Sequence, residues 1–349
     1  MLFFKAVKLI SFIWITLLSS IGITQNISLN LHQTFKLLRN NDLPNNLLIS
    51  KSAVIVRLGD QETQSVPDDK WQEVSEKAHE GFKRTGLDAV AYYYLDDIFS
   101  GTEPQRAIST FLTKRGIKNL IFINYDKTVT GAISYYNIVI TPYSESDDFL
   151  IEGQLAWKGE GPELGRIMNK IFREAVPSQQ RTNLLISEKP EFFEDIQIIK
   201  GKREEVYPVD IKSFKIAVPQ WPDSEISLST IMNQYPLKFE FTDQFPNEDS
   251  LRYRQGNHFV LYFIYTSGAT IKRMLDYKTS EEKRYLSVLN KDGKSELISY
   301  SGMRKVYKFY IKHIVTGNVY LGSAWEAHPS REDALNSFIW NLKNELKLD

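Results

Sequence analysis

Three short runs of strand-type residues decide the fold of the first half of the chain: AVIV at 53–56, AVAYYYL at 89–95 and NLIFIN at 119–124. Runs of this kind, bounded by turn residues, are typical of strands that are buried on both faces of a parallel sheet. Between them lie two segments with apolar residues at helical spacing, one around Trp71 and one around Ala107. This β-α-β-α-β order predicts an open sheet with helices on both faces.

The first half continues with a predicted β-hairpin and a closing amphipathic helix, and the same order of signals recurs in the second half. Ala-Trp precedes the closing helix both times, at 156–157 and at 324–325. The two halves match in the order of their elements but not in residue identity. The match can therefore come from internal duplication or from chance, because βαβ order is common among proteins. We predict the α/β class, with two tandem, duplicated three-layer α/β domains that have mixed sheets.

The N-terminus has the pattern of an export signal. Lys5 and Lys8 precede an apolar stretch at 9–18, and small residues suited to cleavage follow it. This stretch is shorter than the ~20 residues that a membrane-spanning helix needs. The chain is therefore expected to divide into a signal peptide at 1–25, an N-terminal arm at 26–50, a first α/β domain at 51–176, a linker at 177–212 and a second α/β domain at 213–349.

Composition excludes several classes of function. Lys and Arg together number 43, as do Asp and Glu, and a net charge of zero argues against nucleic-acid binding. The chain has no cysteine, which excludes disulfides, thiol catalysis, thiolate metal sites and lipid attachment through cysteine. We expect an exported protein, periplasmic or associated with the outer envelope, that has no membrane span after cleavage of the signal and is not a cysteine-anchored lipoprotein.

The opening strand of the second half begins with a lysine followed by apolar residues, KIAV at 215–218. This strand and the element order of each half resemble the small α/β domains of bacterial envelope assembly proteins. The families are the curli-secretion lipoproteins and the N-terminal domain of the Tol–Pal translocation protein. The resemblance implies an envelope location and a binding role. It transfers no functional residue, because the lipid-acceptor cysteine, the propeller repeats and the pore-forming hairpins of those families are not evident here.

Aspartates lie just past the carboxyl ends of the three predicted crossover strands in the first half. Ligands of open parallel sheets bind at this edge, and carboxylates there could hold Mg²⁺. Aspartates also cap helices and shape turns, and the second half keeps only Asp243 at the corresponding edge. The alternative function is a metal- or phosphate-dependent hydrolase with Asp60, Asp97 and Asp126 as catalytic groups. Its metal ligands would be Asp60, Asp96, Asp97 and Asp126.

Aromatic residues of the second hairpin suggest a binding surface. Tyr307, Tyr310 and Tyr320 are the predicted binding residues, because tyrosine offers a large contact area and one polar group at interfaces. Along the first strand of this hairpin, Lys308, Tyr310 and Lys312 share one face. The alternative is that alternation places half of each strand in the core and that the remaining side chains form cross-strand pairs.

The two halves share features of fold but not the acidic residues. Two similar folds without shared chemistry favour a binding scaffold over an enzyme with two sites. We expect a non-catalytic, exported interaction or assembly module of the envelope or periplasm, which needs no cofactor. Its partner would be an envelope protein or a cell-wall component, and not a nucleic acid. The hydrolase alternative would need Mg²⁺.

Overall fold

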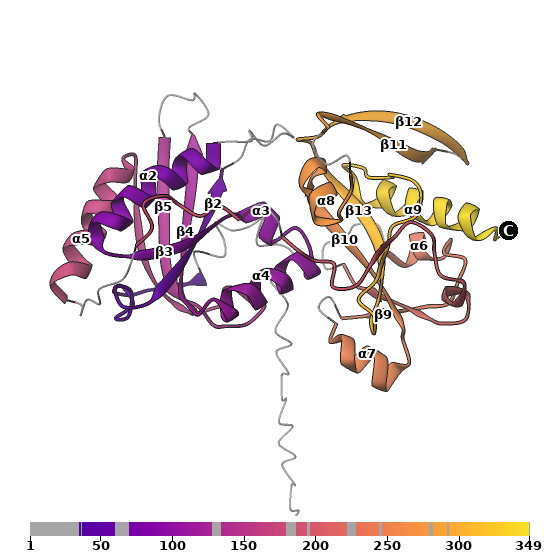
Figure 1. The fold of residues 1–349 in the computed structure, drawn as a ribbon, viewed down its shortest axis with the longest axis horizontal. Helices are drawn as coiled ribbons and strands as arrows, with labels where there is room; N and C mark the ends of the chain where they lie inside the picture. The colour runs from indigo at the N-terminus through magenta and orange to yellow at the C-terminus, as the bar shows by residue number, and fades with distance from the viewer. Residues whose placement is uncertain are drawn as a thin grey trace, which may run out of the picture.

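A computed structural model of the protein describes residues 35, 37–59, 70–127, 134–178, 186–193, 196–221, 228–243, 246–278, 282–291 and 293–348. Within this part of the chain the molecule has two six-stranded mixed sheets with helices packed on them, which confirms the α/β class (Figure 1). The predicted signal peptide at 1–25 and Asp60 lie outside the described residues. None of the described helices is both long and apolar enough to cross a membrane.

The elements of the first half are, in chain order, β1 (Arg39–Asn40), β2 (Lys51–Leu58), α2 (Lys70–Thr85), β3 (Asp88–Tyr94), α3 (Leu95–Ile98), α4 (Thr102–Lys114), β4 (Ile117–Lys127), β5 (Ser134–Pro142), β6 (Leu155–Gly161) and α5 (Leu164–Ser178). The strand order across the first sheet is β1-β6-β5-β4-β2-β3. β2 runs parallel to β3 and β4, whereas β4, β5 and β6 are successive antiparallel neighbours. β1 pairs in parallel with β6, so part of the predicted N-terminal arm belongs to this sheet.

The elements of the second half are β7 (Arg203–Glu204), η2 (Val209–Lys212), β8 (Ile216–Pro219), α6 (Leu228–Met232), β9 (Phe239–Thr242), α7 (Glu248–Gln255), β10 (Phe259–Ser267), α8 (Gly268–Met274), β11 (Arg284–Lys291), β12 (Lys294–Ser301), β13 (Lys305–His313), β14 (Val319–Tyr320) and α9 (Arg331–Leu346). The second sheet has the order β7-β14-β13-β10-β8-β9. Position by position, this order and its strand directions match those of the first sheet. The hairpin β11–β12 is inserted between β10 and β13 and forms a sheet of its own.

Helix α4 lies between the two sheets (Figure 1). It contacts β4 of the first sheet and β10 of the second. Its apolar residues Ile108 and Leu112 are buried in a hydrophobic cluster that also contains Phe122 of β4 and Val260 and Ile264 of β10. The opposite faces of the sheets have cores of their own, under α2 and α5 in the first half and under α6 and α9 in the second. The two halves therefore share one core through α4.

The strand β13 is largely buried on both of its faces. Lys308, Tyr310 and Lys312 share a face as predicted, but all three are buried. Alternation reports only which residues share a face, so it cannot distinguish solvent from a buried ionic partner. Lys308 forms an ion pair with Glu326, and its ammonium group also donates to the carbonyl oxygen of Leu321 at 3.1 Å. Burial alone would lower the pKa of Lys308, but Glu326 raises it overall.

Residues 186–193, called the strap below, lie in the predicted linker and pack along the outer edge of β3. The backbone N–H of Tyr92 donates to the carbonyl of Glu191 at 2.9 Å, and the N–H of Phe193 donates to the carbonyl of Tyr92 at 3.0 Å. The strap therefore continues the first sheet in parallel beyond β3. Its position protects an edge whose amide groups would otherwise be available for pairing.

His79 of α2 fixes the strap from the side and is almost completely buried. Its Nε2 lies 3.0 Å from the carbonyl oxygen of Ser187, and its Nδ1 lies 2.7 Å from the hydroxyl of Tyr92. Because a carbonyl oxygen only accepts, Nε2 carries a proton and donates to Ser187, and Nδ1 shares the second hydrogen bond with the hydroxyl of Tyr92. The imidazole thus joins α2, β3 and the strap.

Candidate functional site

Asp96 and Asp97 do not face an open edge of the first sheet. Asp96 forms an ion pair with Lys305 of β13, and Asp97 accepts a hydrogen bond from the hydroxyl of Thr266 of β10 at 2.9 Å. Both partners belong to the second sheet. These two aspartates therefore connect the halves of the molecule.

Asp126 is separate from this contact. It belongs to β4, where its carboxylate accepts a hydrogen bond from Asn124 at 2.8 Å and lies against the backbone of Gly59. No group of three or more acidic or histidine side chains among the described residues is arranged to hold a metal ion. The structure thus does not bring Asp96, Asp97 and Asp126 together as ligands, and Asp60 falls outside the residues that it describes.

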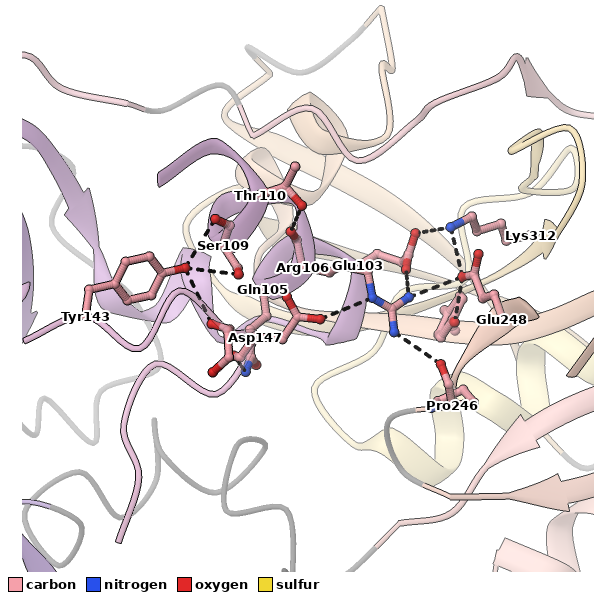
Figure 2. Close-up of polar contacts among 12 residues, drawn as sticks. Glu103, Gln105, Arg106, Ser109, Thr110, Tyr143, Asp147, Pro246, Glu248 and Lys312 are labelled. Carbon is pink, nitrogen blue, oxygen red and sulfur yellow. Dashed lines mark hydrogen bonds and ion pairs between the residues drawn. The ribbon is translucent and has the colours of Figure 1, made fainter. Parts of the chain in front are cut away.

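The central polar feature of the molecule is a buried ionic cluster between the two halves (Figure 2). We define it as Glu103 and Arg106 of α4, Glu248 of α7 and Lys312 of β13. Lys312 forms ion pairs with Glu103 and, at 2.9 Å, with Glu248. Arg106 lies 2.8 Å from Glu103 and 3.3 Å from Glu248, and the hydroxyl of Tyr262 donates to Glu248 at 2.9 Å. Each carboxylate of the cluster therefore contacts both cations.

The local sequence explains how these groups reach the interface. Glu103 lies in the first turn of α4, three residues before Arg106, so both side chains project from one side of the helix. Glu248 begins α7, whose N-cap Asn247 accepts a hydrogen bond from the N–H of Ser250 at 2.9 Å. The guanidinium of Arg106 also donates to the carbonyl of Pro246 at 3.2 Å, directly before this cap.

The cluster is buried at its centre and partly open at its rim, where Arg106 and Glu248 are 24% and 19% exposed and Arg106 also pairs with the exposed Asp147 at 3.5 Å. Lys312 and Glu103 are 2% and 4% exposed. Burial alone would raise the pKa of Glu248, but Lys312, Tyr262 and Arg106 together lower it. Burial alone would likewise lower the pKa of Arg106, and Tyr262, Glu103 and Glu248 outweigh this effect and raise it. The neighbours thus favour the charged form of both groups.

Backbone contacts support the same interface. The N–H of Tyr265 in β10 donates to the carbonyl of Ser100 at 2.6 Å, in the turn that precedes α4. At Gly101, a Cβ atom would lie 2.4 Å from the carbonyl oxygen of Phe263. Only glycine allows the chain to approach β10 this closely. The cluster, the two aspartates and this backbone contact fix one relative position of the two sheets.

The predicted binding tyrosines do not form one exposed surface. Tyr310 is completely buried, because its face of β13 packs in the core shared by the halves. Tyr320 is also buried, in the core under α9. Tyr307 is partly buried and stacks on Tyr265 with ring centroids 4.0 Å apart. These rings contribute to packing, as the alternative from strand alternation expected.

Sequence reasoning missed the cluster. Glu103, Arg106 and Glu248 carry no motif, and Glu103 and Lys312 are 209 residues apart. The one available signal was Lys308 and Lys312 on the same face as Tyr310, next to predicted core strands. Two lysines at such positions indicate buried carboxylate partners, but the sequence does not say which ones.

Comparisons with known proteins do not assign the chain to a family. No protein-family model matches it, and no curated protein matches its sequence. A similar solved structure is a dodecamer of a PelC variant from Paraburkholderia phytofirmans. The two are 9% identical with a TM-score of 0.25, over 41% of this chain and 96% of that chain. A score this low supports no argument about the fold or the function of this chain.

Proposed function

We propose that the protein is a non-catalytic interaction or assembly module of the cell envelope, built from two α/β domains that act as one rigid body. The proposal rests on one observation, namely which groups the acidic residues between the two halves contact. Asp96, Asp97, Glu103 and Glu248 all hold the two halves together. A catalytic carboxylate has to contact substrate, and these four are engaged with protein groups instead.

A fixed arrangement of two sheets suits recognition. A preorganised surface loses less conformational entropy on binding than a flexible one, so a rigid pair of domains presents its surfaces at low cost. The basic and apolar pattern of the first 25 residues supports export. The partner is an envelope protein or a cell-wall component, and the module works without a cofactor.

Calorimetric titration of the purified protein with Mg²⁺, Mn²⁺ and Ca²⁺ separates this function from that of a hydrolase. We expect no saturable heat and no hydrolysis of a phosphomonoester substrate in the presence of these ions. Thr266→Val is the matched control for Asp97→Asn, because it removes the same interdomain hydrogen bond and leaves the carboxylate in place. Metal binding that survives in Thr266→Val and disappears in Asp97→Asn would overturn the proposal.

Cell fractionation of the source organism tests the location. We expect the protein in the periplasmic or envelope fraction and an N-terminus that begins near residue 26. Incubation with purified cell-wall sacculi then separates the two partner classes. Sedimentation with sacculi assigns a cell-wall component, and its absence assigns an envelope protein. Recovery of the uncleaved chain in the cytoplasmic fraction would contradict the proposed function.

A further inference from the structure

The two sheets end in equivalent strands, but only one of these strands is covered within the described residues. β3 closes the first sheet next to β2, and β9 closes the second sheet next to β8. The strap, which follows α5 in sequence, pairs with the outer edge of β3. In the described part of the chain, β9 has β8 as its one neighbour. The outer edge of β9 is thus the counterpart of an edge that binds an extended segment.

The strap shows which kind of segment the outer edge of β3 binds. Its two backbone hydrogen bonds both involve Tyr92, as donor to Glu191 and as acceptor from Phe193. Phe192 packs on the α2 face of the sheet, with its ring centroid 5.2 Å from that of Trp71. Phe193 lies on the other face, stacked on Tyr93 at 5.4 Å. The two adjacent aromatic residues of the strap therefore contact the edge of the sheet on opposite faces.

An ionic contact holds the residue that precedes the aromatic pair. Arg115, directly after α4, forms an ion pair with Glu191. Its guanidinium also lies 5.1 Å from the ring centroid of Phe193. The edge of β3 thus accepts three consecutive residues, an acid followed by two aromatics, in an extended and parallel conformation.

The backbone of β9 offers the same hydrogen-bonding groups. The N–H of Ile216 donates to the carbonyl of Lys238 at 3.0 Å, and the N–H of Gln220 donates to the carbonyl of Thr242 at 3.1 Å. Successive residues of a strand direct their backbone groups to opposite sides. The N–H and C=O groups of Phe239 and Phe241 therefore point away from β8, as those of Tyr92 point away from β2.

Two side chains on one face of this edge are apolar and partly accessible, whereas Glu240 on the opposite face forms an ion pair with Lys215. Phe241 is 36% exposed, and Phe239 packs against it with ring centroids 5.3 Å apart. The following helix α7, which connects β9 to β10 as α4 connects β3 to β4, carries Arg252 and the exposed Arg254. Arg252 lies over the ring of Tyr253, so the exposed Arg254 is the cation that α7 offers to an acidic residue of a bound segment.

We propose that the outer edge of β9 binds an extended segment of a partner protein, parallel to β9, in which an acidic residue precedes two adjacent aromatic residues. The proposal rests on the proposed function as an interaction module and names its site and the chemistry of its partner. Strand addition to a free sheet edge is a general mode of peptide recognition, with affinity from backbone hydrogen bonds and specificity from side chains. The strap of the same molecule is not the occupant, because it is already seated on β3.

The test uses the full chain and a synthetic peptide with the strap sequence ISEKPEFF as the probe. We expect saturable binding, measured by fluorescence anisotropy of the labelled peptide, and weaker binding when Ser replaces both phenylalanines. Hydrogen exchange on the wild-type protein locates the site without any substitution. Exchange should slow at the amides of Phe239 and Phe241 and stay unchanged at Tyr92.

Phe241→Pro is the sharpest variant. It removes an amide that points outward and leaves the β8–β9 hydrogen bonds in place, and proline is tolerated on strand edges of this kind. Phe241→Ala is the matched control, because it also loses the ring but keeps the N–H. We expect Phe241→Pro to bind the peptide about tenfold more weakly than Phe241→Ala, the effect of one backbone hydrogen bond.

Three results would overturn the proposal. The first is no binding by the wild-type protein, and the second is slowed exchange at Tyr92, which would mean that the peptide replaces the strap on β3. The third is dimerisation of the protein alone that Phe241→Pro abolishes, which would identify the occupant as a second copy of this chain. None of these results bears on metal binding or cell location, so a failure here is distinct from a failure of the proposed function.

Discussion

Lys312 of β13 and Glu103 of α4 form a buried ion pair across the two sheets, although 209 residues separate them in sequence. Removing one member of such a pair leaves an uncompensated charge in a medium that solvates it poorly. The same medium strengthens the attraction between the partners that remain. The pair is therefore a sensitive point for testing how firmly the two halves are held.

Lys312→Met should lower the free energy of unfolding by about 3–5 kcal/mol, because Glu103 and Glu248 each lose one of their two cations and Arg106 alone then faces two carboxylates. Urea denaturation measures the change. Adding Glu103→Gln to Lys312→Met should recover part of the loss, since it leaves one carboxylate, Glu248, for the one remaining cation, Arg106. Lys118→Met, at the exposed pair with Glu145, is the control and should cost less than about 1 kcal/mol. Equal losses for the two lysines would contradict the prediction.

Stability should fall at acid pH because of Glu248. Its pKa in the folded state lies below the ordinary value of 4.5, so the unfolded chain takes up a proton first as the pH drops. The stabilisation is therefore present above 4.5 and is lost as the pH falls through the folded pKa. Thermal denaturation across this range should show a shallower decline in Glu248→Gln, although that variant is less stable at neutral pH. Parallel curves for the two proteins would rule out this role.

His79→Ala should loosen the strap. The substitution leaves the hydroxyl of Tyr92 buried without its hydrogen-bond partner, which costs about 1–3 kcal/mol of unfolding free energy. Hydrogen exchange should become faster at the amide of Tyr92, which is bonded to Glu191 of the strap. Lys83→Met is the matched control, because it removes an exposed ion pair between α2 and Glu188 of the same strap. Its exchange rate at Tyr92 should equal that of the wild type.

Gly101→Ala should separate the halves. A Cβ atom at this position would lie 2.4 Å from the carbonyl oxygen of Phe263, so α4 or β10 has to move. Gly165→Ala is the comparison, because its Cβ would meet no atom within 4 Å and alanine favours helix α5 by up to about 1 kcal/mol. Calorimetry should give one transition for the wild type and for Gly165→Ala. A broadened or divided transition is expected for Gly101→Ala. An unchanged transition would contradict the prediction, because it would show that α4 and β10 adjust to the added methyl group without separating.

The order of strands and helices was predictable because each element carries its own local signal. The runs at 53–56 and 119–124 lie within β2 and β4, and Trp71 lies on the buried face of α2. Local patterns also placed Tyr310 and Lys312 correctly on one face of β13.

The interface was not predictable because it depends on residues far apart in the chain. Asp97 was expected at a ligand-binding edge just past the end of a strand, and it lies in α3, the short helix that directly follows β3. What the sequence lacks is the position of Thr266, 169 residues later, which turns that edge into a contact between sheets. Lys308 and Lys312 raise the same difficulty. The periodicity of β13 predicts that the two lysines share a face, but it does not predict which carboxylates lie opposite them.

The position of α4 between the sheets has a consequence for biosynthesis. When this helix leaves the ribosome, β4 soon follows and covers one side of it, but Lys312 is 209 residues away from Glu103. At 5–20 residues per second, the second side of α4 waits roughly 10–40 s for its partner. During that time the nascent chain presents an apolar helix face on which Glu103 has only Arg106 of the same helix as its cation. A chaperone that shields this face would raise the yield of folded protein more than one that acts on the completed chain.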